Sequence, residues 1–394
     1  MRLKLADAIM IAKAAIVAAG TLVAPAAAQT VGGFETRATS VYVRDLTTGI
    51  VLLEKAADVP LPPASMSKLM TLLMLFEALE DGRMTLDTTF TVSERARAMG
   101  GSRMFLETRD RPTALDLIRG IAVKSGNDAT VVVAEGLAGT EEAFAQLATR
   151  RARELGMRNT TIANSSGWPH ADHLMSKRDL GILAEHIIRT YPQYNPYLSE
   201  REFTWNGITQ PNRVPLLGAG IGLDGLKTGF TSAAGYSLTG SAQQGNRRIV
   251  FAFGGLESER ARVQEAEAII NWAFRQFASV RVGQAGQVMS DAPVWLGDMA
   301  TVPLVLAQDA DILVPAIGAR DFSARVVYDS PIPAPIVAGT QIASLIIDIP
   351  DMGETRVPLV AGVDVAEGGF GVRAQASAKR LLSMVLGSAR EAMN

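Results

Sequence analysis

The sequence predicts a mixed α/β (α+β) domain followed by a small all-β domain. Two patterns lead to this expectation. Up to about residue 279, segments with helical spacing of apolar residues alternate with short strand-like runs. Beyond that point, short alternating runs separated by Gly and Pro replace them, which is typical of a small β-rich domain. A chain of 394 residues is long enough for two or three domains.

Composition narrows the class of protein. Apolar residues make up 48% of the chain and charged residues 20%, which is the balance of a soluble globular protein with ample core material. The net charge of −2 gives no reason to expect a nucleic-acid partner. The chain has no cysteine, so disulfides, thiol nucleophiles and cysteine-ligated metals are excluded.

Residues 1–28 have the order of a cleavable secretory signal. Arg2 and Lys4 form a basic start, residues 14–24 form an apolar run, and residues 26–28 are alanines that suit a cleavage site. The apolar run is too short to span a bilayer, which favours a signal over a retained membrane helix. We therefore expect export across the inner membrane to the periplasm.

The first domain, residues 29–279, is expected to hold both helices and strands. Residues 41–54 predict two strands around a turn. Residues 65–79 are apolar on nearly every side, which predicts a buried helix. Residues 113–116 and 176–179 resemble capping boxes that open two more helices. Further helices are expected at 128–135, 141–155 and from 258 to about 277, and strands at 202–205, 224–231, 236–242 and 248–254.

The remaining residues divide into two parts. Residues 280–364 are expected to form the small β-rich domain, and residues 365–394 a linker and an amphipathic C-terminal helix. The apolar stripe of that helix either packs on the β-rich domain or, together with its basic residues, contacts an anionic membrane surface. Peripheral contact with the inner membrane therefore stays open beside simple packing.

The stretch Ser65-Met66-Ser67-Lys68 opens the buried helix. Residues three apart share a helix face, so the Ser65 hydroxyl and the Lys68 amine are expected to meet. Burial disfavours an ammonium, and a lysine with a lowered pKa can take a proton from a serine and activate it as a nucleophile. The alternative is that Ser65 caps the helix while Lys68 reaches solvent. The four-residue pattern alone favours this alternative.

Two further motifs change that balance. Ser125-Gly126-Asn127 lies in a turn between two predicted helices, and Lys227-Thr228-Gly229 lies on a predicted strand. Alone, each is an ordinary structural fragment. All three motifs, in this order and in these contexts, form the set typical of serine β-lactamases and penicillin-binding proteins.

On these motifs the sequence resembles the serine-type D-Ala-D-Ala carboxypeptidases, which are the low-molecular-mass penicillin-binding proteins. The resemblance runs from about residue 41 to the end and includes residues 164–167, 206–213 and 222–231. It implies a β-lactamase/transpeptidase-like fold with an antiparallel sheet, flanking helices and an α-helical subdomain. It also implies removal of the terminal D-alanine from peptidoglycan stem peptides, covalent binding of β-lactam antibiotics such as penicillin, and no cofactor.

The resemblance implies a role for each reacting group. Ser65 would attack the carbonyl between the last two D-alanines and form an acyl-enzyme, with Lys68 as the base. Ser125, within reach of Lys68, would relay a proton to the leaving amine. Asn127 would hold Lys68 and the substrate amide in register.

The resemblance also implies how the substrate is held. Lys227 would supply positive charge, and Thr228 and Arg213 would bind the terminal carboxylate. The backbone N–H of Phe230, with that of the nucleophile, would hold the oxyanion. Gly229 would leave room for the substrate to run beside the strand. Many members have His where this chain has Phe230, which leaves the side-chain preference open.

Two other classes of protein stay as alternatives. A β-lactamase would need fast removal of the acyl group by water, and no Glu-bearing deacylation motif is evident between Ser125 and Lys227. A non-catalytic envelope-binding protein would not need all the reactive groups that are present. His170 and His173 suggest a metal at first sight, but three histidines in the chain and no cysteine favour ordinary loop histidines, so no metal is expected.

Overall fold

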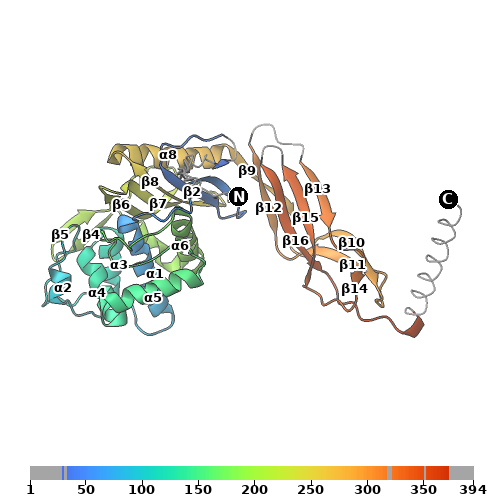
Figure 1. Cartoon of the computed structure of the whole chain (residues 1–394), viewed down its shortest axis with the longest axis horizontal. Coiled ribbons are helices and arrows are strands. Elements are labelled where there is room, and N and C mark those ends of the chain that lie inside the picture. Colours follow the sequence, from blue (N-terminus) through green and yellow to red (C-terminus); the bar gives the residue numbers. More distant parts are fainter. Residues whose placement is uncertain (1–28, 31–32, 317–321, 350–351, 372–394) are drawn as a thin grey trace, which may run out of the picture.

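A computed structural model describes residues 29–30, 33–316, 322–349 and 352–371 (Figure 1). The predicted signal at residues 1–28 and the helix predicted from residue 372 lie outside the described residues. Within the part that is described, no helix combines the length and the apolar character that a membrane span requires.

The first domain is built on a six-stranded sheet with the strand order β1-β3-β2-β8-β7-β6. Every neighbouring pair in it is antiparallel, as the resemblance implies. The strands are β1 (Gln29–Thr30), β2 (Ser40–Asp45), β3 (Val51–Lys55), β6 (Leu223–Thr231), β7 (Gly235–Gln244) and β8 (Arg247–Leu256).

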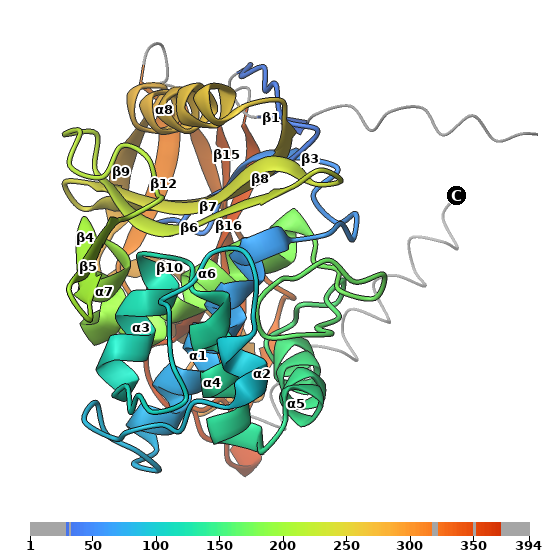
Figure 2. The same ribbon diagram turned by 90° about the vertical axis from the view of Figure 1, so that its left-hand side faces the viewer.

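Helices cover both faces of this sheet (Figure 2). Helix α8 (Glu259–Arg275) lies on one face, and a larger helical layer lies on the other. That layer, with its short turns and a β-hairpin, is the predicted α-helical subdomain. It contains η1 (Ala64–Ser67), α1 (Lys68–Glu80), α2 (Glu94–Arg97), α3 (Ala114–Ala122), α4 (Asn127–Ala138), α5 (Glu141–Glu154), α6 (Lys177–Thr190), η2 (Pro192–Tyr194), α7 (Asn195–Leu198), β4 (Glu202–Trp205) and β5 (Ile208–Pro211).

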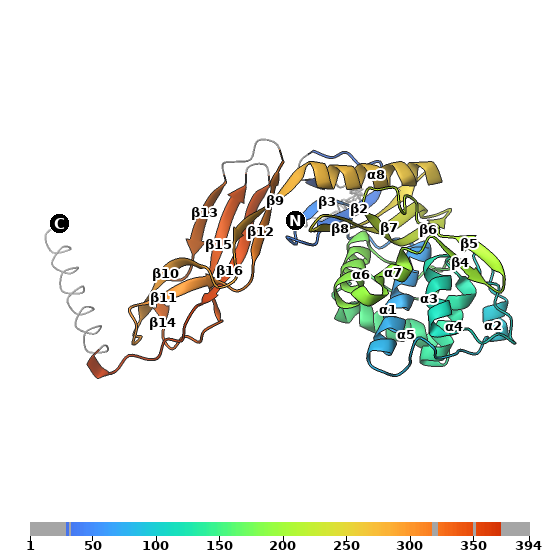
Figure 3. The ribbon, with the colours of Figure 1, turned by 180° about the vertical axis from the view of Figure 1, so that it is seen from behind.

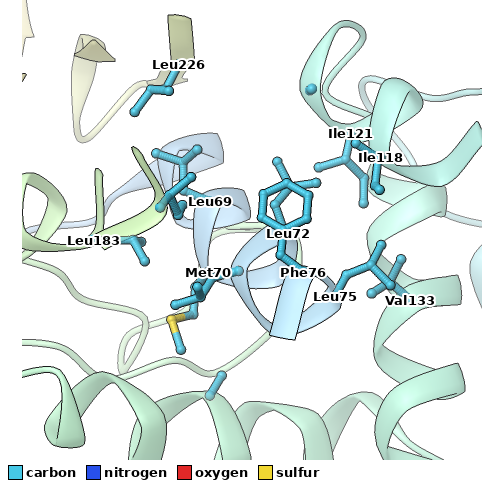
Figure 4. Packing of buried hydrophobic residues seen from close by; sticks show 14 of the residues in the cluster. Leu69, Met70, Leu72, Leu75, Phe76, Ile118, Ile121, Val133, Leu183 and Leu226 are labelled. Atoms are coloured by element: carbon cyan, nitrogen blue, oxygen red, sulfur yellow. The ribbon is translucent and has the colours of Figure 1, made fainter. Parts of the chain in front are cut away.

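Helix α1 is the buried helix that its sequence predicts. Leu72, Leu75 and Phe76 have no exposed surface, because apolar residues occur on nearly every side of the helix and each side meets another element. Figure 4 shows these side chains facing Ile121 of α3 and Val133 of α4. The packing fixes α1, and therefore the residues just before it, rigidly beneath the sheet.

The helix starts show one prediction confirmed and one corrected. At α3, Thr113 and Asp116 make both bonds of a capping box. At α6, Ser176 accepts a hydrogen bond from the backbone N–H of Asp179, at 3.1 Å, but the return bond is not made. The Asp179 carboxylate instead accepts from the Asn159 N–H at 2.8 Å and the Thr160 hydroxyl at 2.7 Å. A tertiary contact has replaced the local one.

The chain continues from α8 into an all-β region (Figure 3). Strand β9 begins at Phe277, which is the residue at which the preceding helix was expected to end. The all-β region therefore begins three residues before the expected residue 280. Strands β9 (Phe277–Gly283) and β12 (Ala310–Pro315) form one sheet. The other has the order β13-β15-β16-β11-β10-β14, from β10 (Val288–Trp295), β11 (Thr301–Leu306), β13 (Ser323–Val327), β14 (Ile332–Pro333), β15 (Gln341–Ile349) and β16 (Gly353–Ala361). The predicted fold class is confirmed.

Candidate active site

Ser65 lies in a single 3₁₀ turn, η1, immediately before α1. The α-helix that was expected from residue 65 begins only at Lys68. Residues i and i+3 eclipse in a 3₁₀ turn, so the turn still places Ser65 and Lys68 on one side. Ala64 has a positive φ of 50°, a strained value for a residue with a side chain. Ser65 is half-buried and lines a cavity of about 680 Å³.

The Lys68 amine is in contact with the Ser65 hydroxyl. Its Nζ lies 2.9 Å from Ser65 Oγ, and it also donates to the backbone carbonyl of Ser166. The side chain has no exposed surface. Burial is the main cause that holds the pKa of Lys68 well below its usual range, and the nearby positive charges of Lys227 and Arg213 lower it further. Such an amine can accept a proton from Ser65.

The loop at residues 164–167 holds the carbonyl that faces Lys68. Asn164 Oδ1 accepts hydrogen bonds from the backbone N–H groups of Gly167 at 2.8 Å, Trp168 at 3.0 Å and Ser166 at 3.2 Å. Gly167 has a φ of +77°, and a Cβ there would lie 2.0 Å from the Ala64 carbonyl oxygen. The glycine therefore lets the loop lie against η1, which brings the Ser166 carbonyl to the lysine.

Ser125 and Asn127 lie where α3 gives way to α4. Ser125 is buried, lines the same cavity and has a positive φ of 66°. Its hydroxyl makes no hydrogen bond within the described part of the chain. The Asn127 amide donates to the Gly100 carbonyl oxygen at 2.8 Å, so it fixes the loop that closes one side of the cavity. No hydrogen bond joins it to Lys68 among the described residues.

Strand β6 forms the opposite wall. The Lys227 side chain is buried beside the cavity, and burial, aided by Arg213 and Arg262, lowers its pKa to about 7. Gly229 has a structural requirement in addition to the role expected toward the substrate. A Cβ there would lie 2.9 Å from the Pro63 carbonyl oxygen and 3.1 Å from Met66 Cγ, so the missing side chain makes room for the turn that carries Ser65.

The far end of the cavity is strongly basic. Arg213 follows β5, is exposed and lines the cavity, which suits it to bind a carboxylate. Arg262 of α8 lines the same end, is almost fully buried, pairs with Glu259 at 2.7 Å and has an unpartnered buried Nε. Sequence reasoning missed Arg262, because its position on an ordinary helix carries no local motif.

The predicted site residues converge. Lys68 and Lys227 are buried beside the cavity, and Phe230 lines it with a side chain that is 54% exposed and whose ring centroid lies 4.3 Å from that of Tyr236. The others that line it are Ser65, Ser125, Asn127, Arg213, Thr228 and Gly229. His173 lies outside this group: its buried Nδ1 accepts from the Ala163 N–H at 3.0 Å.

Comparison with known proteins gives one consistent result. A family profile described as D-alanyl-D-alanine carboxypeptidase matches residues 25–254, and one described as the C-terminal domain of penicillin-binding protein 5 matches residues 277–367. D-alanyl-D-alanine carboxypeptidase DacC of Escherichia coli is 33% identical over 353 residues, which cover 88% of either chain. D-alanyl-D-alanine carboxypeptidase DacF of Bacillus subtilis is 31% identical, over 84% of this chain and 87% of that protein.

Solved structures agree. Penicillin-binding protein 5 from Haemophilus influenzae superimposes with a TM-score of 0.80 at 31% identity, covering 85% of this chain and 99% of the other. Penicillin-binding protein D2 from Listeria monocytogenes, in its ampicillin-bound form, superimposes with a TM-score of 0.56 at 28% identity, covering 61% of this chain and 99% of the other.

Proposed function

The chain belongs to the D-alanyl-D-alanine carboxypeptidase family, and on that premise we propose the residues with which it acts as a serine-type D-Ala-D-Ala carboxypeptidase. The substrate is the D-Ala-D-Ala end of a peptidoglycan stem peptide. The observation that carries the assignment of residues is the 2.9 Å contact between Lys68 Nζ and Ser65 Oγ at a cavity that strand β6 and the Ser125 turn also line.

Acylation begins with Ser65. Its Oγ attacks the carbonyl carbon between the last two D-alanines while the neutral Lys68 amine takes the hydroxyl proton. The C–N bond then breaks, and the departing D-alanine amine receives that proton through Ser125. Water next attacks the ester, gives its proton to Lys68 and displaces Ser65, whose oxygen regains a proton. General-base catalysis of this kind typically contributes roughly 10²- to 10⁴-fold.

The basic end of the cavity binds the terminal carboxylate. Arg213, Thr228 and Lys227 are the proposed partners, and the buried Arg262 adds positive charge behind them. Asn127, tied to Gly100, positions the substrate amide beside the cavity wall. The backbone N–H groups of Ser65 and Phe230 are the proposed oxyanion donors, and each such donor is worth about 3 kcal/mol in comparable enzymes.

The lining of the cavity favours slow removal of an acylated penicillin. Among the described residues that line it, Glu259 is the one carboxylate, and it is paired with Arg262. Glu141, the acid nearest the 164–167 loop, accepts from the Ser165 hydroxyl at 2.6 Å and pairs with Arg95 at 2.7 Å. Neither carboxylate is free to activate water at the ester. This supports a carboxypeptidase over a β-lactamase.

The proposal is tested with labelled penicillin and a D-Ala-D-Ala peptide. The protein should bind one label per chain, release D-alanine from the peptide and keep the label for many turnover times of the peptide. Ser65→Ala should lose both activities with its thermal midpoint unchanged. Rapid release of hydrolysed penicillin would identify a β-lactamase. Absence of both labelling and D-alanine release would identify a non-catalytic binding protein.

The location and domain limits rest on the sequence. We propose that residues 1–28 direct export to the periplasm, that residues 29–279 form the catalytic domain and residues 280–364 the β-rich domain, and that residues 365–394 contact the inner membrane surface peripherally. The basic residues of the last segment support this contact. Loss of sedimentation with anionic vesicles after removal of residues 372–394 is the expected result, and unchanged sedimentation would contradict it.

A further inference from the structure

Two further cavities follow the cavity at Ser65. A second cavity of about 390 Å³ shares Trp168, Thr231 and Ser232 with it. A third, of about 310 Å³, shares Pro62 and Ser232 with the second. The three cavities therefore lie next to one another, in a row that runs from Ser65 past the end of β6 to the start of α6.

The third cavity ends at a buried lysine. Lys177, the first residue of α6, lines it and is 2% exposed. The residue lies against β8, where a Cβ on Gly254 would come 2.9 Å from Lys177 Cε and 3.2 Å from Nζ. Within the described chain, its ammonium makes no hydrogen bond and no ion pair. Burial alone lowers the pKa of Lys177 to about 8, so no neighbouring carboxylate compensates it.

A second polar group in this cavity also lacks a partner. Ser40, on β2, is 1% exposed, and its buried Oγ makes no hydrogen bond within the described residues. Buried polar groups usually have partners, because leaving one unpaired costs about 1–3 kcal/mol. The other buried cations outside the reacting groups have theirs: Arg247 pairs with Asp45 at 2.8 Å, and Arg262 pairs with Glu259.

We propose that Lys177 and Ser40 form a subsite for a carboxylate of the substrate, on the acyl side of the bond that Ser65 attacks. The proposal rests on the proposed function, since it needs a stem peptide acylated at Ser65. A carboxylate would supply the charge that Lys177 lacks and would accept a hydrogen bond from the Ser40 hydroxyl.

The reach of a stem peptide fits this position. Pro62, which lines the third cavity, precedes Ser65 by three residues, so the Cα atoms of the two lie within about 11 Å of each other. Three residues of extended substrate cover the same span. Two carboxylates occur there in stem peptides: that of the γ-linked D-glutamate, and the side-chain carboxylate of a diaminopimelate at the third position.

The test compares matched substrates in each variant. We measure kcat/KM for D-alanine release from L-Ala-γ-D-Glu-L-Lys-D-Ala-D-Ala, from the same peptide with the glutamate carboxylate amidated, and from the peptide with meso-diaminopimelate in place of lysine. The wild-type enzyme should prefer one carboxylate-bearing peptide over its uncharged counterpart by roughly tenfold, through KM, as expected of a charge-assisted hydrogen bond.

Lys177→Met should remove that preference, and Ser40→Ala should reduce it several-fold. Lys55→Met is the control and should keep the preference. It removes a lysine on the sheet that carries Ser40, and this lysine already donates to the Ala38 carbonyl. Loss of the acid-over-amide ratio identifies the glutamate, and loss of the diaminopimelate-over-lysine ratio identifies the third residue. If Lys177→Met keeps both ratios, or the wild type shows neither, the subsite is refuted. A result that refutes the proposed function can be told apart from one that refutes the subsite, because the wild type would then release no D-alanine from any of the peptides.

Discussion

Asn164→Ala should slow acylation without unfolding the protein. The Asn164 side chain accepts three backbone hydrogen bonds that shape residues 164–167, and this loop presents the Ser166 carbonyl to Lys68. Two of these bonds are 3.0 Å or shorter. At about 1 kcal/mol each, their loss weakens the ordered loop by roughly 2 kcal/mol. This corresponds to at most a roughly 30-fold lower population of the loop conformation that presents the Ser166 carbonyl to Lys68.

The assay is the second-order rate constant for acylation by labelled penicillin. We expect this rate constant to fall by about 10- to 30-fold, in line with the loss of about 2 kcal/mol. Ser93→Ala is the matched control, because it removes the N-cap of α2, at about 1 kcal/mol, away from the cavity. It should lower the thermal midpoint with little change in the rate. Acylation of Asn164→Ala at the wild-type rate would show that the loop does not position Lys68.

Two further predictions concern β6. Gly229→Ala should cut acylation at least tenfold, because its Cβ would clash with the Pro63 carbonyl, whereas Gly369→Ala, which meets nothing within 4 Å, should have no effect. Equal rates in both variants would refute the packing argument. The Lys227 ammonium, with a pKa of about 7, is present below that pH and lost above it. KM for a peptide with a free terminal carboxylate should therefore rise from about pH 6 to about pH 8, and Lys227→Gln should remove this rise; a flat KM in the wild type would contradict it.

Local patterns were sufficient for the elements that carry the three motifs. Residues close together in the sequence determine the secondary structure of these elements. Examples are the apolar run of α1, the Thr113 capping box and the glycine-flanked strand β6. The order of the motifs then indicated one shared cavity. Ser65, Ser125 and Thr228 do line it together.

Contacts between distant residues were not visible in those patterns. The carbonyl that faces Lys68 belongs to Ser166, 98 residues away, and Arg262 reaches the cavity from a helix with no motif. The packing requirement at Gly229 was not visible either, because it comes from η1, which lies more than 150 residues earlier in the chain. The Asp179 carboxylate likewise accepts a hydrogen bond from the distant Asn159 N–H and not from the backbone N–H of Ser176 at the start of its own helix. The spacing of apolar residues indicates which face of a helix or strand is buried. It does not indicate which distant residues pack against that face.

The central claim is that Lys68, as a neutral amine, takes the proton of Ser65. The most direct measurement is the acylation rate constant of Lys68→Ala with labelled penicillin, beside its thermal midpoint. Loss of this base should lower the rate by roughly 10²- to 10⁴-fold while the protein stays folded. Acylation of folded Lys68→Ala at the wild-type rate would contradict the claim.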